Sequence, residues 1–76
     1  MNEFRARILL GIFRGETIPE IANALDTSSG YIHDSMVWLR DQGYIKPWIK
    51  GAKRGKELTD DGMAIVFGWY GKGVDG

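Results

Sequence analysis

The spacing of apolar residues predicts helices over most of the chain. Apolar side chains recur at three- and four-residue intervals, which is the period of a helix with one buried face. Thr17 and Glu20 form a capping-box pattern at the start of one such stripe, and Gly43 ends another. The helices are expected at about residues 2–14, 18–26, 28–42 and 60–70.

The period changes between the third and fourth expected helices. Residues 44–50 are rich in β-branched and aromatic side chains, and residues 56–59 form a shorter run after a glycine-bounded turn. Pro47 has no N–H to donate, so its position should face an edge or a bulge. We therefore expect a β-hairpin over about residues 44–59. The predicted fold class is mainly α with a small hairpin (α+β), in the order helix-helix-helix-strand-strand-helix.

Length and composition limit how this chain can be stabilised. Its 76 residues form one domain near the lower size limit for independent folding, expected over residues 1–70 with a flexible tail at 71–76. There is no cysteine, so neither disulfides nor thiolate metal sites can contribute. Three Trp, three Phe and three Tyr should contribute much of the stabilisation, and a second subunit could cover any surplus apolar area.

Positive charge is concentrated in one segment although the whole chain is neutral. Ten basic and ten acidic side chains cancel, which argues against a globally basic nucleic-acid binder. Residues 46–56, however, carry no acid and contain Lys46, Lys50, Lys53, Arg54 and Lys56. Such a cluster suits contact with a phosphate backbone. It also suits a solvated hairpin whose lysines protect an edge strand from aggregation.

Three short motifs occur in a familiar order. Ile21 to Leu25 reads IANAL, residues 28–45 form a helix pattern that ends in Gly-Tyr-Ile, and residues 57–62 read ELTDDG. Over roughly residues 4–67 the chain resembles the winged helix-turn-helix superfamily of small prokaryotic, archaeal or viral regulators, including the MarR-like and PadR-like groups. The resemblance implies a winged helix-turn-helix fold, with a recognition helix at 28–42 that enters the DNA major groove and a hairpin wing that lies along the backbone.

The resemblance and the charge pattern together predict a dimeric regulator that binds double-stranded DNA. The expected DNA-contacting residues are Ser28, Ser29, Tyr31, His33, Lys50, Lys53, Arg54 and Lys56, and the expected homodimer contacts on the last helix are Val66, Trp69 and Tyr70. Two of these have structural alternatives, since Ser28 can simply cap a helix and Tyr31 can pack over the first helix. The exposed positions of the recognition helix depart from the family, because they hold Ser28, Ser29, Gly30, Tyr31, His33 and Asp34 instead of the Arg, Lys, Gln or Asn side chains that usually read bases.

Other classes of function receive less support from the residues. The alternative prediction is a winged helix module that binds proteins, with little or no DNA binding. No enzyme is expected, because paired carboxylates in a plausible cleft, a phosphate loop and a metal cluster are all missing from the sequence. His33 is the only histidine, so no metal or cofactor is expected. No apolar run is long enough for a membrane span, and a cytoplasmic location is predicted.

Overall fold

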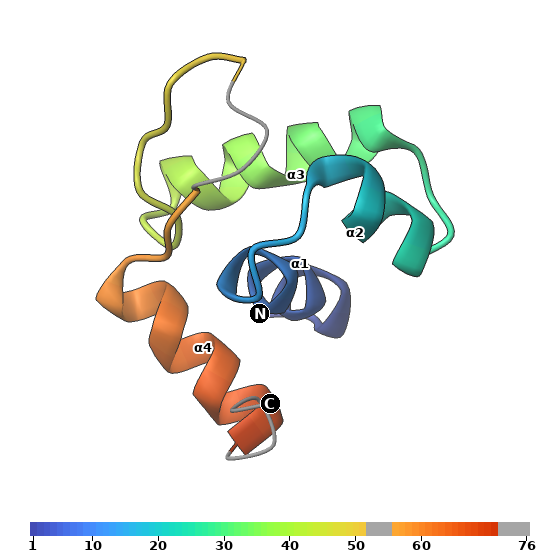
Figure 1. Ribbon diagram of the computed structural model, residues 1–76. Coiled ribbons are helices and arrows are strands. Elements are labelled where there is room, and N and C mark those ends of the chain that lie inside the picture. The colour runs from blue at the N-terminus through green and yellow to red at the C-terminus, as the bar shows by residue number, and fades with distance from the viewer. Residues whose placement is uncertain (52–55, 72–76) are drawn as a thin grey trace.

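The computed structural model describes residues 1–51 and 56–71 and contains four helices in that part of the chain (Figure 1). They are α1 (Glu3–Phe13), α2 (Ile18–Ala24), α3 (Ser29–Asp41) and α4 (Asp60–Tyr70). Each end lies within two residues of the range that the apolar spacing predicts.

Side-chain caps explain where these helices begin. The residues that precede the four helices are Asn2, Thr17, Ser28 and Thr59, and each accepts a hydrogen bond from a backbone N–H three residues further on. At α2 the capping box is complete, since Glu20 Oε1 also accepts from the backbone N–H of Thr17 at 2.8 Å. Such caps satisfy N–H groups that have no partner inside the helix.

Helix α1 lies at the centre of the molecule, between α4 on one side and the α2–α3 pair on the other (Figure 1). Its buried residues therefore extend around most of its circumference rather than along one stripe: Ala6, Ile8, Leu9, Leu10, Gly11 and Ile12. Gly11 allows α2 to approach closely, because a Cβ there would lie 2.7 Å from Ile21 Cγ1. The core combines α1 with Ile32, Met36 and Leu39 of α3 and Val66 of α4.

The predicted fold class is wrong, because the hairpin strands do not form. The connection between α3 and α4, residues 44–59, contains one isolated antiparallel bridge between Ile45 and Leu58, and no strand occurs among the residues that the structure describes. Two backbone hydrogen bonds flank this bridge, from Lys46 N to Glu57 O at 2.8 Å and from Thr59 N to Tyr44 O at 3.1 Å. Pro47 follows at once and has no N–H to extend the ladder. The described chain is helical rather than α+β.

Thr59 joins the end of α3 to the start of α4. Its hydroxyl donates to the carbonyl oxygen of Gly43 at 2.6 Å and also accepts from the N–H of Gly62 at 3.1 Å. Gly43 has a φ of 87°, a conformation that glycine adopts without strain. These contacts, with the buried side chains of Ile45 and Leu58, hold both ends of the connection against the helices.

Candidate nucleic-acid interface

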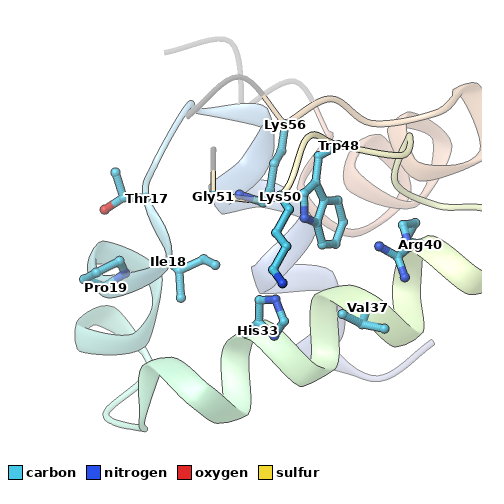
Figure 2. A pocket seen from close by; sticks show the side chains of 10 residues that line it. All are labelled: Thr17, Ile18, Pro19, His33, Val37, Arg40, Trp48, Lys50, Gly51 and Lys56. Atoms are coloured by element: carbon cyan, nitrogen blue, oxygen red, sulfur yellow. The ribbon is translucent and has the colours of Figure 1, made fainter. Parts of the chain in front are cut away.

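A cleft of about 810 Å³ opens between α3, the first residues of α2 and the connection (Figure 2). Apolar residues form part of its wall, and cationic side chains from two separate segments converge on it. The lining residues are Thr17, Ile18, Pro19, His33, Val37, Arg40, Trp48, Lys50, Gly51 and Lys56. We call this the cationic cleft, because its lining includes three permanent cations and no carboxylate.

The period of α3 explains why His33, Val37 and Arg40 share the cleft. They follow one another at intervals of four and three residues, and a helix has about 3.6 residues per turn, so they lie along one flank. The neighbouring stripe of Ile32 and Met36 is buried in the core. Core packing of α3 therefore fixes the direction in which this flank faces.

The opposite wall of the cleft depends on Trp48, which is half-buried and packs against the core. The guanidinium carbon of Arg40 lies 4.8 Å from the centre of the indole ring, and the ammonium nitrogen of Lys56 lies 5.3 Å from it. The Lys50 side chain extends from the connection toward His33 on α3 (Figure 2). The indole thus brings cations from distant parts of the chain together.

The outermost line of α3 is acidic, and we call Asp34 and Asp41 the acidic crest. Their side chains are 85% and 60% exposed, respectively. Asp34 Oδ1 lies 3.8 Å from His33 Nδ1, and Asp41 Oδ1 lies 3.4 Å from Arg40 Nε. Any polyanion that approaches α3 is therefore attracted by the cleft side of the helix and repelled by its crest.

The third side of α3 packs against α1 and is aromatic. The ring centres of Tyr31 and Phe4 are 5.4 Å apart, and the guanidinium of Arg5 lies 3.8 Å from the ring centre of Trp38. We call these residues the aromatic flank. Tyr31 is 56% exposed, but it lies on this flank and does not line the cationic cleft.

The structure brings together only part of the predicted DNA-binding set. His33, Lys50 and Lys56 line the cleft. Ser28 caps α3 through its hydroxyl oxygen, which accepts from Tyr31 N at 3.1 Å, and Ser29 is exposed beside it in the first turn. The predicted contacts at residues 53 and 54, Lys53 and Arg54, lie outside the described residues.

Seven of the ten residues that line the cleft are missing from the predicted set, and Arg40 and Trp48 are the two that bear most on its charge. Arg40 lies seven residues after His33, so helical periodicity alone could have placed both on one flank. Trp48 had no such signal, because its role depends on how the connection folds back over α3. Among its described residues the connection has no repeating backbone structure from which such a position could be predicted.

Helix α4 contacts α1, and its outer face is aromatic. Val66 is fully buried inside the chain, whereas Phe67 and Trp69 are 42% and 46% exposed. The ring of Phe67 meets that of Phe13 edge to face at 5.7 Å. Burial raises the pKa of the Tyr70 phenol above its usual value, while the positive charge of Arg7 opposes that shift. The surface available for a partner is therefore carried by Phe67 and Trp69, with Tyr70 at its edge.

Comparison with known proteins gives this chain no relative. No family model matches it, and no curated protein or solved structure matches it significantly. Within the part of the chain that the structure describes, no helix is long and apolar enough to cross a membrane. The function of this chain must therefore be inferred from the cleft and its surroundings.

Proposed function

We propose that this protein binds double-stranded DNA and acts as a transcriptional regulator. The observation that carries the proposal is the charge of the cationic cleft, in which Arg40, Lys50 and Lys56 converge with His33 and no carboxylate among the lining residues. The chain as a whole has no net charge, yet it places several cations in one concave site. This distribution is suited to a local contact with a polyanion. Phosphate contacts of this kind supply most of the non-specific affinity for DNA.

The charges on α3 restrict how the duplex can dock. The acidic crest would face phosphates if α3 entered a groove with its outermost line foremost, and that approach is unfavourable. Docking by the cleft flank places Arg40 and His33 toward the backbone and keeps the exposed Ser29 in the first turn near the groove. In this orientation the hydroxyl and backbone groups of the first turn are available to phosphates or base edges.

A homodimer through α4 would complete the proposal. The exposed Phe67 and Trp69, with Tyr70 beside them, form an apolar surface on a helix that otherwise packs against α1. Such a surface can pair with its own copy across a two-fold axis. Two α3 helices would then reach successive major grooves, about 34 Å apart on one face of the duplex. A regulator of this kind would act in the cytoplasm.

A protein-binding function is the second candidate, and the aromatic flank favours it. Tyr31 and Trp38 remain 56% and 39% exposed even though Phe4 and Arg5 pack against them. Exposed Tyr, Trp and Arg side chains are the types that contribute most to protein interfaces. A module that uses this flank would not need the cationic cleft, so the two candidates can be separated by experiment.

The test is a fluorescence anisotropy titration of a mixed-sequence duplex at low and moderate salt. A DNA-binding protein shows weak non-specific affinity that falls steeply as salt rises. Lys50→Gln should lower the affinity at low salt. The matched control Arg14→Gln should change it little, because Arg14 is an exposed cation at the C-terminal cap of α1 that interacts with Tyr70 and does not line the cleft. Absence of binding at low salt refutes the DNA function and leaves the protein-binding candidate.

A further inference from the structure

One exposed line of α3 alternates aromatic and acidic side chains. Tyr31, Asp34, Trp38 and Asp41 follow one another at intervals of three, four and three residues, which is the spacing of positions that face a partner helix. All four residues are exposed. The line combines the acidic crest with the two α3 residues of the aromatic flank, and we call it the mixed stripe.

Helix α1 holds the two aromatic rings of the mixed stripe in place. The ring centre of Phe4 lies 5.4 Å from that of Tyr31, and the guanidinium carbon of Arg5 lies 3.8 Å from the ring centre of Trp38. A side chain that is already packed against a neighbour loses less freedom when a partner binds. Tyr and Trp side chains held in this way are typical anchors of protein interfaces. The stripe therefore presents two ordered anchors seven residues apart.

The charge between the two anchors is negative. Asp34 lies between Tyr31 and Trp38 in the stripe, and its side chain is 85% exposed. Its Oδ1 lies 3.8 Å from His33 Nδ1, a contact that pairs opposite charges only when the imidazole is protonated. Asp41, at the end of the stripe, lies 3.4 Å from the permanent cation Arg40. A complementary partner therefore needs a cation opposite Asp34 more than opposite Asp41.

From this arrangement we propose that the mixed stripe binds a helical segment of another protein, which carries a Lys or Arg between two large apolar residues at three- and four-residue spacing. The two apolar residues pack on Tyr31 and Trp38, and the cation faces Asp34. A second copy of this chain does not fit, because two such stripes face to face would bring both carboxylates of each copy into one seam. The stripe lies on a different side of α3 from the cationic cleft. The inference therefore goes beyond DNA binding and does not depend on it, and it gives the protein-binding candidate a defined partner.

The probe is a peptide selected on the wild-type protein from a phage-displayed library of single helices with one randomised face. The selected peptides should share a Lys or Arg between two large apolar residues at the stated spacing. The strongest binder is labelled with fluorescein, and its Kd is measured by anisotropy at low and moderate salt. Tyr31→Ala and Trp38→Ala should each weaken binding at least about tenfold, the loss typical of a central interface residue. Asp34→Asn should weaken it about two- to fivefold, with a smaller effect at the higher salt.

Two controls and one further variant separate the stripe from the rest of the surface. Trp69→Ala removes an exposed aromatic residue from α4, which packs on the other side of α1, and should leave peptide binding unchanged. Lys50→Gln, in the cationic cleft, should also leave it unchanged. Circular dichroism confirms that each variant is folded. Should an alanine variant fail to fold, Asp34→Arg replaces it, because position 34 is too exposed for the change to disturb packing. Asp34→Arg should weaken peptide binding more than Asp34→Asn does.

Several results would overturn the inference. They are a selection that yields no peptide above background, selected peptides without the basic and apolar pattern, and binding that is insensitive to Trp38→Ala and Asp34→Arg. Peptide binding that is lost in Trp69→Ala would place the contact on α4 instead. Analytical ultracentrifugation tests the second copy as the occupant. A dimer that Trp38→Ala dissociates and Trp69→Ala leaves intact would assign the stripe to self-association and overturn the proposed partner.

Asp34→Asn also distinguishes this inference from the DNA function, because the two predict effects of opposite sign. Removal of the carboxylate should weaken binding of the basic peptide and strengthen binding of a duplex. Peptide binding that depends on the stripe, without any duplex binding at low salt, supports the inference and refutes the DNA function. Duplex binding by a protein for which no peptide can be selected supports the DNA function and overturns the inference. If neither ligand binds wild type, both proposals are refuted.

Discussion

Gly62 is the position at which the structure predicts the largest effect of a single methyl group. A Cβ built on Gly62 would overlap with the carbonyl oxygen of Tyr44 and lie 3.3 Å from the Cβ of Leu58. The Tyr44 oxygen belongs to the backbone and accepts a hydrogen bond from Thr59 N at 3.1 Å, so it cannot rotate away as a side chain would. Gly62→Ala must therefore move the first turn of α4 away from the connection.

The cost of this movement can be assembled from its parts. Overpacking of this kind costs about 1–3 kcal/mol. Separation of α4 from the connection also weakens the hydrogen bonds of Thr59 to Tyr44 and Gly43, at about 1 kcal/mol each. Alanine returns about 0.5–1 kcal/mol through its better helix propensity. We expect a net loss of about 2–4 kcal/mol, which is a large fraction of the roughly 4–11 kcal/mol typical for a domain of this size.

Gly68 provides the matched control, because it lies in the same helix and a Cβ there would meet nothing within 4 Å. Gly68→Ala should raise the free energy of unfolding by about 0.5–1 kcal/mol through helix propensity alone. Urea unfolding followed by circular dichroism measures both variants. Thermal unfolding should show a fall of at least about 10 °C for Gly62→Ala. If Gly62→Ala is as stable as Gly68→Ala, the contact between α4 and the connection is not as described.

Three further predictions concern packing, docking and pH. Gly11→Ala should lower the free energy of unfolding by about 1–3 kcal/mol in urea titrations. The reason is that its Cβ would lie 2.7 Å and 2.8 Å from two atoms of the buried Ile21 side chain. Unchanged stability would contradict the close approach of α1 and α2. Asp34→Asn should strengthen duplex binding about two- to fivefold in low-salt anisotropy titrations, because it removes one negative charge of the acidic crest. Weaker binding would argue against phosphates near the cleft flank. Burial raises the pKa of Tyr70 in the folded state above its ordinary value of 10.0. The contribution of the neutral phenol to stability is therefore complete below pH 10.0, and it is lost as the pH rises through the higher pKa of the folded state. The free energy of unfolding should therefore fall less between pH 9 and pH 11 for Tyr70→Phe than for wild type, with Tyr31→Phe as the control. Equal falls in all three proteins would contradict the effect of burial on Tyr70.

The helices could be predicted from the sequence because their signals are local. Caps such as Thr17 and Thr59 act within three or four residues, and the apolar stripe of α3 repeats with the helical period. The hairpin prediction was wrong because β-branched and aromatic residues favour any extended, half-buried backbone, and strands also need a partner with a continuous ladder. Here Pro47 interrupts that ladder one residue after Lys46, and burial of Ile45 and Leu58 holds the connection instead.

The cleft was only partly predictable, because it depends on contacts between distant segments. Lys50 and Lys56 stood out as members of a basic run, and His33 as the only histidine. That they share one cleft with Arg40 follows from the path of the connection over α3, which no local pattern encodes. The roles of the apolar residues of α4 were also only partly predictable. Val66 and Trp69 are both apolar, but Val66 is buried whereas Trp69 is exposed.

Although the net charge of the chain is zero, its charges are unevenly distributed around α3. On α3 the cation Arg40 faces the cleft, while Asp34 and Asp41 form the crest beside it, so charges of opposite sign are separated across the width of one helix. A balanced protein exerts little long-range attraction on a polyanion, because solvent ions screen its small net field within about 10 Å at 0.1 M salt. At contact distance, however, the separated charges favour one flank and penalise the neighbouring crest. The charge pattern should therefore determine the orientation of a bound duplex more than the rate at which it is captured.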